Sequence, residues 1–208
     1  MKQNHLFPIL LTLLLLPAIS FGQYDKLLTE RLNVFGPLQF QGKAYNLVRT
    51  SYTPDSATYN TYKQEYLPPG VGLDTFKSMF IIYVYTGNAT MEDIATAKLD
   101  ELRALEKDNS VASHQTFNNK KTGEFMIDFL NSANSSDGQY IDMVERSVFR
   151  YNTVTAKSGQ ECVLLLGAIV RGYGDDVEAF MNALKTKAKL DLIRDVGKYV
   201  IPEITIAK

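Results

Sequence analysis

The chain has 208 residues, of which 45% are hydrophobic and 22% are charged, with 22 Lys and Arg against 23 Asp and Glu. This length fits one ordinary domain behind a short leader, and the composition is that of a chain able to bury a core. The formal net charge of −1 gives no basic field, so we expect no nucleic-acid partner and no strong attraction to an anionic membrane.

The start of the chain has the pattern of an export signal. Lys2 supplies a positive charge, residues 6–16 form an apolar core, and small residues precede a cleavage site before Gln23. The apolar run is shorter than the roughly 20 residues that a membrane-spanning helix needs. We therefore expect residues 1–22 to be removed and residues 23–208 to form a single domain. That domain would be periplasmic or extracellular and would not insert into a membrane.

The first half of the mature chain is predicted to contain a helix, three strands and a second helix. Apolar spacing indicates a short helix over residues 23–35, ended by Gly36 and Pro37. Runs rich in aromatic and β-branched residues predict strands over residues 38–52, 59–67 and 76–85. Thr90 followed by Asp93 forms a capping-box pattern, and the apolar spacing after it predicts a helix over residues 91–108.

The second half is predicted to contain four strands and a closing helix. The strand patterns cover residues 111–117, 124–130, 139–151 and 161–170. Residues 161–170 are apolar on both faces, so this strand is expected to be central in the sheet. One helix is expected over residues 175–200. Because short turns join most strands, we predict an α+β fold with a largely antiparallel sheet of about six to seven strands covered by helices.

The order of these elements resembles the family of the photosystem accessory protein PsbP and its bacterial relatives. The resemblance covers most of the mature chain. It is carried by Phe149-Arg150-Tyr151, the apolar strand over residues 161–170 and the helical pattern over residues 175–200. It implies a PsbP-like sandwich that serves as a compact binding or assembly domain without known chemistry. None of that family's ligand residues can be matched to positions here.

The residues needed for familiar catalysis are scarce. Residues 23–208 contain one histidine, His114, so the usual multi-histidine metal site cannot be built within one chain. The only cysteine, Cys162, lies inside an apolar strand, where a core role is expected. Gly172 and Gly174 lack the third glycine of a dinucleotide fingerprint, and the acids that follow would repel phosphate. We therefore expect no catalytic residue, no metal site and no cofactor.

Tyrosines on the polar strands are the compositional feature that suggests a binding surface. Tyrosine combines apolar area with a hydroxyl, which suits a contact surface for a partner. It is also simply a good strand former that half-buries, and this alternative stays open. If the tyrosines share a surface, it would bind another envelope protein, a peptide or a glycan. The candidate contact residues are Tyr52, Tyr59, Tyr62, Tyr66 and Pro69.

Two functional hypotheses follow from these observations. The first is an exported, non-enzymatic binding or accessory protein that helps another envelope component to assemble or function. The alternative is a small-molecule carrier or a small enzyme with a pocket between sheet and helix. That alternative needs carboxylates such as Asp128 or Glu145 to converge in a pocket that raises their pKa.

Overall fold

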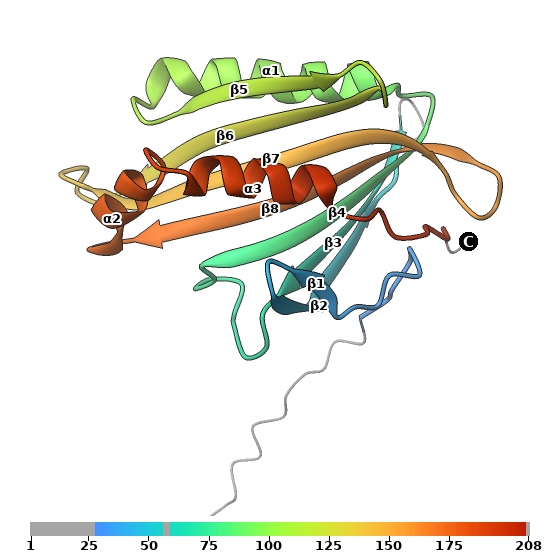
Figure 1. Cartoon of the computed structure of the whole chain (residues 1–208), viewed down its shortest axis with the longest axis horizontal. Helices are drawn as coiled ribbons and strands as arrows, with labels where there is room; N and C mark the ends of the chain where they lie inside the picture. The colour runs from blue at the N-terminus through green and yellow to red at the C-terminus, as the bar shows by residue number, and fades with distance from the viewer. Residues whose placement is uncertain (1–27, 56–58, 207–208) are drawn as a thin grey trace, which may run out of the picture.

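A computed structural model describes residues 28–55 and 59–206 and has an α+β fold, with helices on both faces of one antiparallel sheet (Figure 1). The eight strands lie in the order β1-β2-β3-β4-β8-β7-β6-β5. The strands are β1 (Leu38–Phe40), β2 (Lys43–Thr53), β3 (Tyr59–Leu67), β4 (Ser78–Gly87), β5 (Ser113–Asn119), β6 (Glu124–Asn134), β7 (Ile141–Thr155) and β8 (Glu161–Tyr173). The helices are α1 (Met91–Asp108), α2 (Asp176–Ala183) and α3 (Ala188–Lys198).

The predicted export signal and the start of the mature chain lie outside the described residues. Within those residues, no helix combines the length and the apolar character needed to span a membrane. The predicted α+β class and the antiparallel sheet are confirmed, and β8 is central as expected, with β4 and β7 on either side.

The sheet has one strand more than the upper limit predicted, because residues 38–52 form a hairpin rather than a single strand. Gln41 and Gly42 connect β1 to β2, and both have positive φ angles, of 48° and 72°. Two consecutive positive φ angles are typical of the tight turn that joins antiparallel strands. The pairing of Phe40 with Lys43 closes the hairpin directly around this turn.

The helix predicted over residues 23–35 is wrong for its described part, since residues 28–35 contain no helix. Leu32 and Val34 are buried in an irregular segment, while the exposed Asn33 between them has a φ of 58°. The carboxylate of Glu30 accepts hydrogen bonds from the backbone amides of Leu32, Asn33 and Val34 at 2.8–3.1 Å. These bonds satisfy amides that a helix would otherwise pair with its own carbonyls.

The long helix predicted over residues 175–200 is divided into α2 and α3. The hydroxyl of Thr186 donates a hydrogen bond to the carbonyl oxygen of Ala183 at 2.7 Å, just after α2 ends. A threonine hydroxyl that binds a nearby backbone carbonyl competes with continuation of the helix. The break lets α3 bury Leu192 and Val196 against the sheet, whereas α2 has no fully buried residue.

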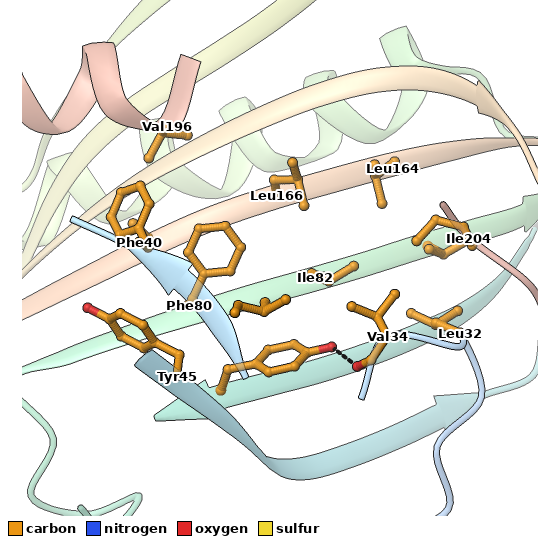
Figure 2. Packing of buried hydrophobic residues seen from close by; sticks show 14 of the residues in the cluster. Leu32, Val34, Phe40, Tyr45, Phe80, Ile82, Leu164, Leu166, Val196 and Ile204 are labelled. Atoms are coloured by element: carbon orange, nitrogen blue, oxygen red, sulfur yellow. Dashed lines mark hydrogen bonds between the residues drawn. The ribbon is translucent and has the colours of Figure 1, made fainter. Parts of the chain in front are cut away.

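The two faces of the sheet are covered to different extents. On the α3 face, as we call it, α3 crosses β7 and β8, and the segments before β1 and after α3 extend the cover (Figure 1). Leu32 and Ile204 from these two segments pack with Phe80, Ile82 and the central strands in one core cluster (Figure 2). On the opposite face, the α1 face, α1 lies over the β5 and β7 side of the sheet.

A glycine in the central strand shapes the packing on the α1 face. A Cβ atom at Gly167 would lie 2.7 Å from Cδ1 of Phe149 and 2.9 Å from Cγ1 of Ile81. Both distances are too short for carbon atoms, so the Phe149 ring occupies space that only glycine leaves free. Gly167 therefore positions an aromatic ring that lines the groove described below.

Glu30 is an acid-sensitive anchor for the segment before β1. Burial works to raise the pKa of Glu30, but hydrogen bonds from Gln64 and from the amides of Val34, Leu32 and Asn33 outweigh it. The net effect is a pKa below the ordinary 4.5. A lowered carboxyl pKa contributes stability that is present above 4.5 and is lost as the pH falls through the folded-state pKa.

We expect Glu30→Gln to lower the free energy of unfolding at neutral pH by roughly 1 kcal/mol or less, because the site is only partly buried. The difference from the wild type should shrink in acid, where Glu30 is itself protonated. Urea unfolding at neutral pH and well below pH 4.5 measures both quantities. Glu161→Gln, at an exposed strand end, is the control. An equal deficit at both pH values would show that the carboxylate charge is not what anchors the segment.

Candidate functional site

A groove of about 240 Å³ lies on the α1 face where the flank of α1 meets the sheet. Its floor comes from four strands and is mostly aromatic, and its wall comes from α1. The lining residues are Tyr59, Tyr83, Tyr85, Phe149, Tyr151 and Leu165 from the sheet, and Ile94, Ala97, Lys98 and Glu101 from α1. Phe149, Tyr151, Leu165 and Ile94 are buried, so the base of the groove is part of the core.

Strand alternation and pairing register bring the floor tyrosines together. Tyr83 and Tyr85 are two residues apart in β4, so both point to the same face. Their rings are nearly parallel, with an angle of 5° and centroids 5.9 Å apart. Tyr59 in the neighbouring strand β3 approaches Tyr85 edge to face, at 82° and 5.5 Å. The three rings form one half-exposed aromatic surface beside α1.

The helix that forms the wall is held in place at its first turn. Thr90 and Asp93 make the predicted capping box, with the Thr90 hydroxyl 3.2 Å from the Asp93 amide. Lys98 and Glu101 lie further along the helix on the groove side and form an ion pair at 2.8 Å. The Lys98 ammonium group also lies 4.9 Å from the centroid of Phe129, a favourable cation–π distance.

Two hydroxyl groups in the groove lack protein partners. Neither the Tyr85 nor the Tyr151 hydroxyl makes a hydrogen bond within the part of the chain that the structure describes. Tyr151 is only 1% exposed, but its hydroxyl is not fully enclosed. The small exposed part of the side chain therefore includes the hydroxyl. Burial, followed by the neighbouring tyrosines, raises the pKa of both groups. Both hydroxyls therefore stay protonated and can donate a hydrogen bond at any physiological pH.

The charged groups around the groove are already paired. Lys98 is bound to Glu101, and beside Tyr83 the ammonium group of Lys63 lies 2.7 Å from Glu65. Burial works to raise the pKa of Glu65, but its contacts with Arg49 and Lys63 outweigh burial and lower the pKa. Glu65 is thus a paired carboxylate and not a proton acceptor poised for catalysis. The groove offers ring faces and hydroxyls without a net charge.

The candidate tyrosines predicted from sequence do not share one surface. Tyr52 and Tyr62 are cross-strand partners on the α3 side of the sheet, with ring centroids 4.7 Å apart. Tyr59 lies on the opposite face, in the groove. The expectation of a common face is corrected here, because β3 alternates its side chains between the two faces.

Tyr66 and Pro69 are also separated from the others. Tyr66 is fully buried, and its hydroxyl donates to the carbonyl oxygen of Val34 at 2.6 Å, with Oε1 of Gln64 a further 2.5 Å contact. Tyr66 therefore holds the segment before β1 in place and cannot contact a binding partner at the surface. Pro69 is exposed just after β3, at the end of the strand opposite to Tyr59.

The carboxylates named for the alternative hypothesis do not converge. Asp128 lies on the α3 face in a buried ion pair with Arg146, where their side chains are 4% and 3% exposed. Gln115 donates a further hydrogen bond to Asp128 at 2.5 Å. Glu145 lies in β7, where side-chain alternation points it to the face opposite Arg146, and it binds Arg171 at 2.7 Å.

A second hollow of about 350 Å³ opens beside this ion pair, between β5 and β6 on one side and the α2–α3 region on the other. Asp128 and Arg146 lie at its lining with Met181 and Leu184. Both carboxylate oxygens of Asp128 are occupied by Arg146 and Gln115, so the pair fastens the structure and has no free acid or base group.

The two residues singled out for their reactivity lie apart from each other. His114 contacts Glu106 of α1 at 2.6 Å and ties β5 to that helix. Cys162 is buried on the α3 face, where burial raises the pKa of its thiol. Over residues 28–55 and 59–206, no group of three or more His, Cys, Asp or Glu side chains is placed to hold a metal ion.

Most of the groove residues were missed by sequence reasoning. The signal for Tyr83 and Tyr85 is present, because they alternate at the end of the apolar run over residues 76–85. Nothing in the sequence places Tyr151 beside them, since β7 reaches this position only through its pairing with β8. Lys98 and Glu101 look like an ordinary exposed pair three residues apart on a helix.

Comparison with known proteins gives a family and no named relative. No curated protein and no solved structure matches the chain. One protein-family model matches residues 32–201, a range that contains all eight strands and all three helices. The chain therefore belongs to this family, which is uncharacterised.

Proposed function

We propose that the chain is an exported, non-enzymatic binding protein, and that the groove between α1 and the sheet is its binding site. The observation that carries the proposal is that the hydroxyls of Tyr85 and Tyr151, among half-exposed and buried rings, have no partner among residues 28–55 and 59–206. Polar groups of largely buried side chains usually have hydrogen-bond partners, so a largely buried tyrosine whose hydroxyl opens into a groove without one is a candidate for contact with a ligand. A hollow with an aromatic floor and a few convergent polar groups is a common form of binding site.

Binding is favoured over catalysis by the state of the charged groups. Glu101, which lines the groove, holds Lys98 at 2.8 Å, and Glu65 holds at 2.7 Å the Lys63 that lies over Tyr83. A general acid or base needs a free group within hydrogen-bond reach of the reacting atom. The tyrosine hydroxyls beside them have raised pKa values, which makes them poor bases at neutral pH.

An accessory or assembly role in the cell envelope is the broader setting that we propose for this binding. The leader pattern over residues 1–22 supports export, and the resemblance to the PsbP family, which implies a binding or assembly domain, supports the role. The partner would present its group to the α1 face, since α3 and the two terminal segments occupy the other face. A PsbP-like sandwich is compatible with the antiparallel sheet between helices.

Blocking the groove is the direct test. Ala97 is exposed on α1 and lines the groove, so Ala97→Trp should fill it without disturbing the core. We expect the wild-type protein, purified gently from its own cell envelope, to carry an added mass or a companion polypeptide in native mass spectrometry. Ala97→Trp should reduce that occupancy at least about tenfold, as expected when steric exclusion removes most of the contact energy.

The matched control is Ala104→Trp, an exposed alanine on the same helix outside the groove lining. It should keep the bound species at the wild-type level. An added mass of small-molecule size would indicate that the protein is a carrier. A companion polypeptide would indicate that it is an accessory protein. If Ala97→Trp retained either species as fully as Ala104→Trp does, the groove would not be the binding site.

A further inference from the structure

The aromatic floor of the groove suits a ligand with a C–H-rich face. Tyr83 and Tyr85 present near-parallel rings, and Tyr59 stands edge-on to Tyr85. The face of an aromatic ring is weakly negative, so it attracts polarised hydrogen atoms that approach it. Phe149 and Leu165 continue the apolar surface toward the base of the groove.

The base of the groove requires a ligand that also carries oxygen atoms. In the free protein, water must hydrate the hydroxyls of Tyr85 and Tyr151, because neither has a partner among the described residues. A ligand that displaces such water loses affinity unless it reproduces the same hydrogen bonds. A purely apolar group, such as a leucine or phenylalanine side chain, would leave a buried tyrosine hydroxyl unsatisfied.

The ionic groups at the rim indicate a neutral ligand. Lys98 and Glu101, the charged residues that line the groove, are paired with each other, and nearby Lys63 is paired with Glu65, which Arg49 also contacts. A charged ligand would have to compete with these ion pairs and would be desolvated without a compensating partner. The paired Lys98 and Glu101 can still donate to and accept from hydroxyl groups at the rim.

The size of the groove limits how much of a ligand it can hold. The volume of about 240 Å³ is below the roughly 300–1,000 Å³ of pockets that enclose drug-sized ligands. The groove therefore holds part of a larger molecule or a single small one.

We infer that the groove binds one ring of a neutral saccharide, stacked on Tyr83 and Tyr85 with its hydroxyls bonded to Tyr85 and Tyr151. A pyranose ring has a C–H-rich face and a rim of hydroxyls that donate and accept hydrogen bonds. It also has no charge. This inference rests on the proposed function, whose binding site it uses, and it names the class of ligand.

Binding of neutral sugars to the purified full chain tests the inference. The probes are glucose, galactose, N-acetylglucosamine and their short oligomers, with blocked, uncharged tyrosine- and asparagine-containing peptides as the competing class. The chain has no tryptophan, so intrinsic fluorescence reports its tyrosines directly, and calorimetry provides a second readout. We expect saturable binding of at least one sugar, with an affinity that does not change with salt concentration.

Two substitutions should separate recognition from folding. Tyr151→Phe removes only a hydroxyl that has no partner in the described part of the chain, so we expect the affinity for that sugar to fall about fivefold while the melting temperature stays unchanged. Tyr83→Ala removes a stacking face and should weaken binding about tenfold. Tyr140→Phe, an exposed tyrosine outside the groove lining, is the control and should bind normally.

Each other outcome overturns a specific statement. If the peptides bind and no sugar does, or if binding weakens steeply with salt, the saccharide assignment is wrong while the groove remains a binding site. The same holds if native mass spectrometry finds a species that Ala97→Trp displaces but no sugar binds. If no probe binds and Ala97→Trp changes nothing in native mass spectrometry, both the saccharide assignment and the proposed function are wrong.

Discussion

Replacing Arg146 by methionine is expected to lower the free energy of unfolding by roughly 3–5 kcal/mol, because it leaves the Asp128 carboxylate buried without its cation. The two side chains are 3% and 4% exposed, and Nε of Arg146 lies 2.7 Å from Oδ1 of Asp128. Arg146 also donates to the carbonyl oxygen of Lys189 at 2.7 Å. The substitution therefore removes the charge partner and one of the bonds that hold α3 on the sheet. Urea unfolding followed by far-ultraviolet circular dichroism measures the loss.

Two companion variants identify the cause of that loss. Arg194→Met removes an arginine from exposed ion pairs with Asp191 and Asp195, and we expect no measurable change in stability. The double variant Arg146→Met with Asp128→Leu removes the buried pair as a unit and should recover most of the stability. A double variant as unstable as Arg146→Met alone would mean that the contact with α3, and not the unpaired carboxylate, dominates.

Phe80→Ala is expected to have an effect of similar size, roughly 3–5 kcal/mol, because it empties the centre of the α3-face core. Phe80 is 0% exposed, and its ring centroid lies 4.7 Å from that of Tyr199 and 5.2 Å from that of Phe40. Figure 2 shows the rings of Phe80 and Phe40 side by side. These neighbours come from β1 and from the segment after α3. The cavity would therefore loosen the chain segments that close this face. The same unfolding assay gives the value.

The control for this prediction is Phe35→Ala, where the ring is 65% exposed and a change within about 0.5 kcal/mol is expected. Phe80 points away from the groove, so its loss should leave the affinity for any groove ligand unchanged in the fraction that remains folded. A drop in stability below about 1 kcal/mol would indicate that the ring cluster rearranges to fill the space.

Several features of the fold could be predicted from the sequence because they depend on neighbours along the chain. The capping box at Thr90 and Asp93 and the apolar spacing after it give α1 its observed limits. The doubly apolar run over residues 161–170 predicts a central strand, and β8 is central. These are local effects of backbone hydrogen bonding and side-chain periodicity, which the order of residues expresses directly.

Other features escaped prediction because a distant part of the chain outweighs the local pattern. The leucine spacing before Gly36 favours a helix, but burial of Leu32 and Val34 in one core cluster with Ile204 favours an irregular segment. Likewise, an apolar repeat continues from α2 into α3, and Thr186 interrupts it through a bond to Ala183 that spacing alone does not reveal.

The sequence by itself determined the fold class, the central strand and the limits of α1. The tertiary structure alone decided which tyrosines meet. Alternation tells which residues of one strand share a face, but the register between strands decides that Tyr59 and Tyr85 touch while Tyr66 is sealed in the core. The groove arises because α1 covers only part of its face, which depends on how the helix packs across strands distant in sequence.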